Sequence, residues 1–215
     1  DGILAAAAPG TVMIDSSTID VESAQAVHEA AKSAGFNMID APVSGGVIGA
    51  DAGTLTFMCG GDKESFEKAK PILQGMGKNI VHCGSGGLGQ ATKICNNMLA
   101  GINALAAAEA MTMGERLGVS PDILYEVIST STGRSYIFET SNPMPDVCST
   151  SPANNKFKPG FMAKLMLKDL RLSQAAAQDA KTSTPLGAAA TAAFQQLIDS
   201  GFGDLDTSSI IKVIK

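Results

Sequence analysis

The sequence predicts an α/β part followed by an all-helical part, with residues 1–85 in the first and residues 86–215 in the second. Two observations support this division. Strand-like and helix-like runs alternate as far as Cys83, which is typical of an α/β sheet. After Gly89, apolar residues recur at helical spacing. We therefore expect one long helix to connect the two parts.

Four short apolar runs predict the strands of the first part: Thr11–Asp15, Phe36–Ile39, Thr54–Met58 and Ile80–Cys83. One helix is expected between the first and second strands, and another between the third and fourth. Asp20 and Asp62 stand where they can cap these helices, from about Val21 and from the residue after Asp62. Gly35 and the segment 75–77 contain the glycines that end them.

The second part opens with a proline-free run over residues 90–117, which predicts the long helix. Ser120-Pro121 and Thr184-Pro185 each place an N-cap residue before a proline at the first helical position. Alanine-rich patterns predict further helices over residues 165–181 and 186–198. The segment between Arg134 and the first of these contains four prolines and is interpreted as a long loop.

Composition excludes several functions. The net charge of -5 argues against nucleic acid as a partner, and no basic run suggests a membrane surface. No apolar run approaches the ~20 residues that span a bilayer. Four separated cysteines and two histidines make a metal site improbable and indicate buried, reduced thiols. The chain begins at Asp1 without Met or a targeting segment, so we interpret it as the middle of a longer protein.

One glycine motif resembles a nucleotide-binding loop. The segment 84–89 matches G-x-G-x-x-G between a predicted strand and a helix. That interpretation also requires an acid at the end of a second strand about 20 residues later. Glu109 stands at that distance, but inside the predicted long helix. We therefore interpret these glycines as a tight strand-to-helix turn, and no other cluster in the sequence fits the dinucleotide fingerprint.

Three segments carry candidate chemistry. In Asp40-Ala-Pro-Val-Ser-Gly-Gly46, Ser44, Gly45 and Gly46 expose a hydroxyl and backbone N–H groups that suit a carboxylate, although an ordinary turn explains them as well. In the long helix, Lys93 and Asn97 share one face. A lysine among apolar residues is poorly hydrated, which favours its neutral form and proton exchange with an alcohol. A solvated surface lysine remains the alternative.

The third segment is Lys168-Asp169-Leu170, which interrupts an apolar stripe. Because adjacent residues do not face each other on a helix, we do not expect Lys168 and Asp169 to form a simple ion pair. Taken alone, this segment is typical of a helix surface.

Together, these three segments resemble the motifs of the β-hydroxyacid dehydrogenase family and occur in the same order. They are Asp40–Gly46, the G-x-G-x-x-x-K-x-x-x-N run over residues 87–97, and Lys168-Asp169-Leu170. The resemblance covers essentially the whole chain. It implies the C-terminal part of a Rossmann-type domain, then the connecting helix and an all-α domain. It also implies that the family's cofactor loop would precede Asp1.

The resemblance implies an NAD-dependent enzyme acting on a small hydroxy acid. Lys93 would be the catalytic residue, Ser44, Gly45 and Gly46 would hold the substrate carboxylate, and Asn97 would orient the substrate. The cofactor residues would be Thr18 and Lys168, with NAD as cofactor. A homodimer or homotetramer is implied, as is the mitochondrial matrix for a eukaryotic source and the cytoplasm otherwise.

The substrate stays open within the family. The member that oxidises 3-hydroxyisobutyrate in valine breakdown is favoured by Asp15-Ser-Ser-Thr18 and Lys93-Ile-Cys-Asn-Asn97. Reduction of tartronate, glyoxylate or succinic semialdehyde is the alternative, because the glycine turn and Lys93 serve any of these substrates. A third hypothesis is that the chain is a non-catalytic oligomerisation module.

Overall fold

The computed structural model describes residues 2–215, which form two compact units. The first extends to Cys95, and the second runs from Asn96 to Lys215. The division falls inside helix α5 (Leu88–Arg116), so the units are joined by helical backbone rather than by a loop. The sequence predicts the boundary at residues 85 and 86, where the strand ends and the helix begins.

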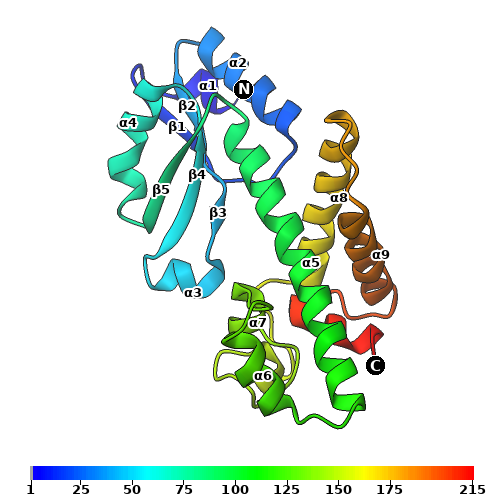
Figure 1. The fold of residues 1–215 in the computed structure, drawn as a ribbon. Coiled ribbons are helices and arrows are strands. Elements are labelled where there is room, and N and C mark those ends of the chain that lie inside the picture. Colours follow the sequence, from blue (N-terminus) through cyan, green and yellow to red (C-terminus); the bar gives the residue numbers. More distant parts are fainter. Residues whose placement is uncertain (1) are drawn as a thin grey trace. The chain divides into compact units, whose positions relative to one another are not determined.

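A five-stranded sheet organises the first unit (Figure 1). Its strands are β1 (Val12–Asp15), β2 (Asn37–Asp40), β3 (Val43–Ser44), β4 (Leu55–Gly60) and β5 (Gly77–Gly84). β1 and β2 run parallel, with Asp15 opposite Asp40, so both strands end at the same edge. β4 and β5 are also parallel to each other, whereas β4 is antiparallel to β2 and β3. The four predicted strands are confirmed, with small shifts at their ends.

The chain changes partner at Asp40. This residue pairs with Asp15 on one side and with Gly60 on the other, and β3 then continues along β4. β3 is not predicted from the sequence, because Pro42 has no N–H to donate and only two residues lie between Pro42 and Gly45. Asp40 therefore occupies the centre of the sheet, at the junction of its two halves.

Aspartate caps begin the main helices of the first unit as expected. The helices that precede α5 are α1 (Ile3–Ala6), α2 (Val21–Ser33), α3 (Gly46–Asp51) and α4 (Lys63–Leu73). Asp20 accepts a hydrogen bond from the backbone N–H of Ser23, and Asp62 accepts one from Ser65. The short helices α1 and α3 are not predicted by the sequence.

The core of the first unit lies among β2, β4 and α4. Its buried members are Ile39, Ala41, Leu55, Phe57, Cys59, Phe66, Ala69 and Leu73. Burial raises the pKa of the Cys59 thiol to about 12, so this side chain stays protonated. All four cysteines are free thiols, but the expectation that they are buried holds only for Cys59: Cys83 and Cys148 are half-buried and Cys95 is exposed.

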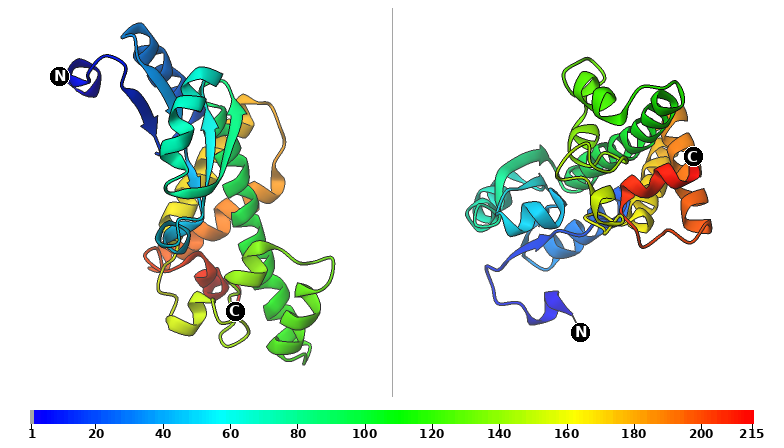
Figure 2. Two further views of the ribbon diagram at one scale, coloured as in Figure 1. Left: turned by 90° about the vertical axis from the view of Figure 1, so that its left-hand side faces the viewer. Right: turned by 90° about the horizontal axis from the view of Figure 1, so that it is seen from below.

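Helices build the second unit. After α5 come α6 (Pro121–Ser129), α7 (Tyr136–Thr140), the 3₁₀ segment η1 (Pro152–Asn155), α8 (Ala163–Asp179), α9 (Pro185–Asp199) and the 3₁₀ segment η2 (Thr207–Val213). α8 and α9 pack along each other (Figure 1; Figure 2). Large apolar side chains of α5, α8, α9 and η2 form the core, among them Met111, Met166, Leu170, Phe194 and Ile210.

Two details of the helical unit differ from the sequence predictions. The long loop after Arg134 contains α7 and η1. Ser120 and Thr184 occupy the N-cap positions of α6 and α9, but neither side chain makes a capping hydrogen bond. The hydroxyl of Thr184 donates instead to the Gln174 side chain on α8. Both helices nevertheless begin with proline at the first helical position, as expected.

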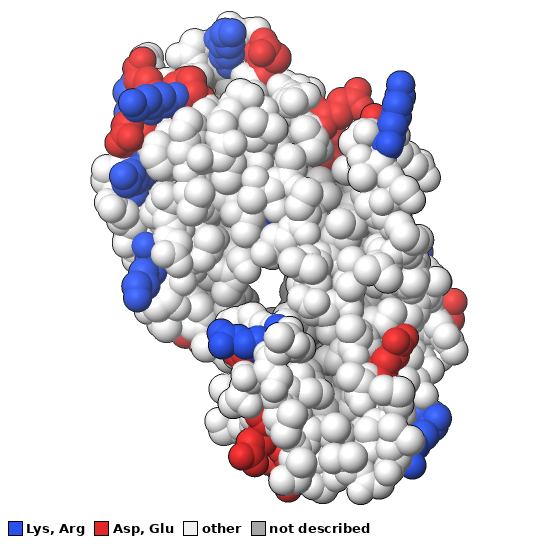
Figure 3. Space-filling view, in the orientation of Figure 1, with Lys and Arg blue, Asp and Glu red and all other residues white. Residues whose placement is uncertain are grey.

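Charged side chains of both signs are interspersed on the face shown in Figure 3. Lys and Arg form no continuous patch on that face. No helix among residues 2–215 combines the length and apolar character needed to cross a membrane.

Candidate functional site

The predicted carboxylate-binding turn lies between a strand and a helix. Ser44 ends β3, Gly45 is the N-cap of α3 and Gly46 is its first residue. Gly45 has φ 132°, a conformation that L side chains rarely adopt, and an added Cβ would lie 3.0 Å from Cδ2 of Leu55. Because the first N–H groups of a helix have no intrahelical acceptor, this turn presents backbone donors beside the Ser44 hydroxyl.

The structure places Lys93 beside this turn. Lys93 lies in the second turn of α5, and only 8% of its surface is exposed. Its Nζ donates a hydrogen bond of 2.7 Å to the backbone carbonyl of Val43, the residue before Ser44. Two segments that are far apart in the sequence, each predicted to carry chemistry, are thus in direct contact within the first unit.

Thr18 lies in the segment between β1 and α2, at the carboxyl edge that β1 shares with β2. Ligands of open α/β sheets bind at such edges. The backbone on both sides of Thr18 is held by Gln90 of α5. Nε2 of Gln90 donates to the carbonyl of Ser17 over 2.8 Å, and Oε1 accepts from the N–H of Ile19 over 3.2 Å. Gln90 is not among the predicted site residues, because nothing in the sequence pairs it with residues 17 and 19.

The backbone amides at the glycine segment 84–89 bind an anion, which is the side-chain carboxylate of Asp40. Oδ1 of Asp40 accepts from the N–H of Gly87 over 2.8 Å, and Oδ2 accepts from the N–H of Gln90 over 2.9 Å. Nε2 of His28 lies 2.8 Å from Oδ1 and therefore carries a proton toward it. The amides that would bind a pyrophosphate are occupied by a protein carboxylate, which supports the rejection of these glycines as a dinucleotide loop.

Steric contacts explain the glycines of this turn. A Cβ on Gly86 would lie 2.6 Å from Cγ of the His28 ring, and one on Gly89 would lie 2.3 Å from the carbonyl oxygen of Met58. Both distances are far below van der Waals contact. The glycines are required so that α5 can begin directly against α2 and β4, rather than to leave space for a nucleotide.

In the second unit, Asp169 joins two of the predicted residues. Nδ2 of Asn97 donates to Oδ2 of Asp169 over 2.6 Å, and Nζ of Lys168 lies 3.1 Å from Oδ1. The expectation that Lys168 and Asp169 do not pair is wrong, because the long lysine side chain reaches back to its neighbour. Asp169 and Asn97 are both buried. Asp169 is part of the Lys168-Asp169-Leu170 motif, but nothing in the sequence indicates a role for its side chain.

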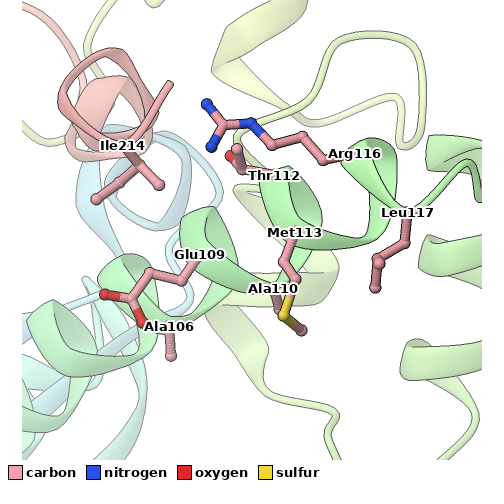
Figure 4. Close-up of a pocket in the computed structure, with 8 residues that line it drawn as sticks. All are labelled: Ala106, Glu109, Ala110, Thr112, Met113, Arg116, Leu117 and Ile214. Carbon is pink, nitrogen blue, oxygen red and sulfur yellow. The ribbon is translucent and has the colours of Figure 1, made fainter.

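A shallow hollow of about 530 Å³ lies along the second half of α5 (Figure 4). Its lining residues are Ala106, Glu109, Ala110, Thr112, Met113, Arg116, Leu117 and Ile214. None of the predicted catalytic or cofactor residues lines it. Met113 and Leu117 are exposed by 62% and 75% and project from the same side of the helix (Figure 4).

Family models match both parts of the chain. Residues 1–84 match a model described as the NAD binding domain of 6-phosphogluconate dehydrogenase. Residues 87–214 match one described as NAD-binding of NADP-dependent 3-hydroxyisobutyrate dehydrogenase. The fold and these matches define an NAD-dependent oxidoreductase with a Rossmann-type part and a helical part, as the sequence predicts.

Individual relatives narrow the class. The NAD-dependent L-serine dehydrogenase of Pseudomonas aeruginosa is 46% identical over 99% of this chain and 72% of its own length. The 3-hydroxyisobutyrate dehydrogenase of the same organism is 46% identical over 100% of this chain and 73% of its own length. The chain therefore belongs to the β-hydroxyacid dehydrogenase family, among the 3-hydroxyisobutyrate dehydrogenases and their relatives.

A solved structure agrees with this placement. The Mycobacterium tuberculosis 3-hydroxyisobutyrate dehydrogenase with L-serine superposes with a TM-score of 0.93 at 46% identity, covering 99% of this chain and 73% of that one. The relatives from Drosophila melanogaster and Mus musculus, at 42% and 40% identity, are named as mitochondrial proteins.

The network around Asp40 gives a prediction for stability. Burial of the carboxyl opposes its ionisation, but the hydrogen bonds from His28, Gly87 and Gln90 outweigh that effect and lower the pKa of Asp40 below 3.8. Asp40→Asn cannot accept from all three donors. We expect a loss of about 1–3 kcal/mol of unfolding free energy at pH 7, measured by urea denaturation.

The pH dependence tests the cause. A lowered native pKa stabilises the fold above the unfolded pKa of about 4, and this contribution is lost as pH falls through the native value. The difference between wild type and Asp40→Asn should therefore be constant from pH 7 to about pH 4 and shrink below it. Asp51→Asn, at an exposed position, is the control. A difference that stays constant down to about pH 2.5 would contradict the assignment.

Proposed function

We propose that the protein oxidises 3-hydroxyisobutyrate to methylmalonate semialdehyde with NAD, as a step of valine breakdown. The observation that carries this proposal is the contact between Lys93 and the Val43 carbonyl, which sets a buried amine beside the turn of Ser44. The family and the relatives named 3-hydroxyisobutyrate dehydrogenase support it.

Lys93 would move the proton of this reaction. As a neutral amine, it would accept the proton of the substrate hydroxyl while a hydride leaves the carbon that bears this hydroxyl. The Val43 carbonyl can accept a hydrogen bond from the amine and from the ammonium, so it would hold Nζ in place in both states. A positioned base of this kind contributes typically 10²–10⁴-fold to the rate.

Ser44, Gly45 and Gly46 would bind the substrate carboxylate through the serine hydroxyl and the backbone amides that begin α3. Asn97, which lies one helical turn after Lys93 in α5, would orient the substrate. Its amide is already oriented, because Nδ2 faces the Asp169 carboxylate and Oδ1 accepts from Asn96.

NAD, when bound, supplies the hydride acceptor. Thr18 fits this group by position, since it follows β1 at the edge where sheets of this class bind nucleotides. We propose that Thr18 contacts the nicotinamide end and that Lys168 approaches the cofactor from the helical unit. The glycines of residues 84–89 take no part, because Asp40 occupies their amides.

L-serine is a second candidate substrate. One relative is named an L-serine dehydrogenase, and the solved structure with TM-score 0.93 is described with L-serine. Both candidates are 3-hydroxy carboxylates in which one carbon separates the primary alcohol from the carboxylate. The carbon between these two groups carries a methyl in 3-hydroxyisobutyrate and an ammonium in L-serine. The Ser44 turn would bind the carboxylate, and Lys93 would accept the hydroxyl proton, of either molecule.

Replacing Lys93 tests the mechanism. Arginine at this position stays protonated and alanine has no base, so Lys93→Arg and Lys93→Ala should each lower kcat by about 10²-fold or more. NADH binding, followed by its fluorescence, should change little. Lys63→Ala, an exposed lysine of α4, is the control. Ser44→Ala should instead raise KM for the hydroxy acid. Full turnover in Lys93→Ala would exclude the assigned role.

A substrate panel tests the specificity. We expect the highest kcat/KM with 3-hydroxyisobutyrate, measured by NADH formation, and a lower value with L-serine, because an ammonium group, unlike a methyl group, needs a hydrogen-bonding or charged partner to offset its lost hydration. A higher value with L-serine would favour the second candidate. Faster reduction of tartronate, glyoxylate or succinic semialdehyde would place the protein elsewhere in the family.

We also propose that the protein is a homodimer or homotetramer in which the second half of α5 meets another copy. Ala106, Ala110, Met113 and Leu117 recur at four- and three-residue intervals on one side of this helix, and the last two are largely exposed. An apolar stripe of this spacing is typical of a helix that packs against a partner.

Charges on this stripe should separate the copies. Met113→Glu combined with Leu117→Glu places two carboxylates in the proposed contact, so the mass measured by light scattering should fall to that of a monomer. Glu109→Gln is a matched control that removes a charge from the same hollow. An unchanged mass in the double variant would rule out this surface.

A further inference from the structure

Gln90 is fully buried near the start of α5, and both ends of its amide are used. Nε2 donates to the Ser17 carbonyl, while Oε1 accepts from the Ile19 N–H. A carbonyl can only accept and a backbone N–H can only donate, so these partners fix the orientation of the amide. One side chain thus bonds the backbone immediately before and immediately after Thr18.

The backbone of Gln90 is held from the opposite direction. Its N–H donates to Oδ2 of Asp40 over 2.9 Å, and Asp40 also receives bonds from Gly87 and His28. Gln90 therefore joins the segment after β1 to the end of β2 and to the first turn of α5. Lys93 follows three residues later on the same helix, where Nζ reaches the Val43 carbonyl.

We propose that Gln90 is a positioning residue for hydride and proton transfer, because it fixes the Thr18 segment relative to the helix that carries Lys93. This inference rests on the proposed roles of Thr18 and Lys93. Hydride transfer requires the nicotinamide and the substrate carbon to approach within a narrow range of geometry. Thr18, assigned to the nicotinamide, and Lys93, assigned to the substrate, belong to segments that are distant in the sequence. Gln90 lies on the helix that carries Lys93 and is hydrogen-bonded to the segment that carries Thr18.

A purely structural role would be served by any group that fills the space. The Gln90 bonds, however, go to the irregular segment between β1 and α2 rather than to a neighbouring helix or strand. Within that segment the Asp15 side chain also accepts from the Ser17 N–H, which tightens its beginning. The bonds to Ser17 and Ile19 thus define the path of the three residues centred on Thr18.

Two substitutions separate packing from hydrogen bonding. Gln90→Met keeps the length of the side chain and removes both bonds. Gln90→Glu keeps an acceptor for the Ile19 N–H and loses the donor to the Ser17 carbonyl. Gln74→Met at the exposed end of α4 controls for the chemical change, and Leu73→Ala, in the buried core of the same helix, controls for lost stability.

Cofactor binding and turnover are the first measurements. We expect Gln90→Met to raise the Kd for NADH and to lower kcat, each by about tenfold, which is the effect of losing roughly one or two hydrogen bonds. KM for 3-hydroxyisobutyrate should stay within about twofold of wild type, because the Ser44 turn is untouched. The Kd and kcat of Gln90→Glu should lie between those of wild type and those of Gln90→Met. With substrate deuterated at the reacting carbon, the isotope effect on kcat should increase in Gln90→Met.

Hydrogen exchange gives a readout that does not need activity. The Ile19 amide should exchange faster in Gln90→Met, whereas the amides within β4 and β5 keep wild-type rates. Unchanged exchange at Ile19, or kinetic losses that Leu73→Ala reproduces in proportion, would overturn the inference. If the wild type oxidised no 3-hydroxy acid, the proposed function would fail, and the exchange rates and the NADH titration would still decide the role of Gln90.

Discussion

The buried carboxylate of Asp40 is the constraint on which the first unit depends. A charge removed from water is costly unless hydrogen bonds replace its hydration, and here a ring nitrogen and two backbone amides do so. The same three bonds tie together α2, the end of β2 and the start of α5. A negative charge is also favoured at this end of a helix, because the helix dipole is positive there. The position of α5 is thus set by electrostatics as well as by packing.

This arrangement explains why a nucleotide-like motif has a different role here. In a dinucleotide loop, glycines let the phosphates approach the helix amides. In this chain the same spacing lets a side-chain carboxylate approach, and His28 and the Met58 carbonyl occupy the space that side chains on Gly86 and Gly89 would need. The G-x-G-x-x-G spacing indicates only that an anion lies at the N-terminus of the helix. Because no acid follows at the end of a second strand, the sequence favours a protein carboxylate over the phosphate of a bound dinucleotide.

Local signals predict most of the fold. Asp20 and Asp62 cap helices where the sequence places them, and the alternation of apolar runs gives four of the strands. β3 and α3 escape prediction, because each is short and both surround Gly45, whose conformation depends on the packing of Leu55. The contacts of Gln90 and Asp169 also escape, since each joins residues more than seventy positions apart. The chemistry of the residue types suggests Ser44 and Lys93 as candidates, whereas the roles proposed for them and for Thr18 rest on family resemblance and not on periodicity.

The candidate site residues are distributed over both units, and α5 is the element they share. Lys93 stands before the division at Cys95 and Asn97 after it, yet one turn of helix separates them. Because the helix is hydrogen-bonded throughout, the spacing between these two side chains is set by helical geometry, whatever the arrangement of the units. Each end is then fixed locally, Lys93 by Val43 and Asn97 by Asp169. The roles proposed for Lys93 and Asn97 thus rest on one continuous helix, and Gln90 and Asp169 bond that helix to the Thr18 segment and to Lys168, to which we assign cofactor contacts.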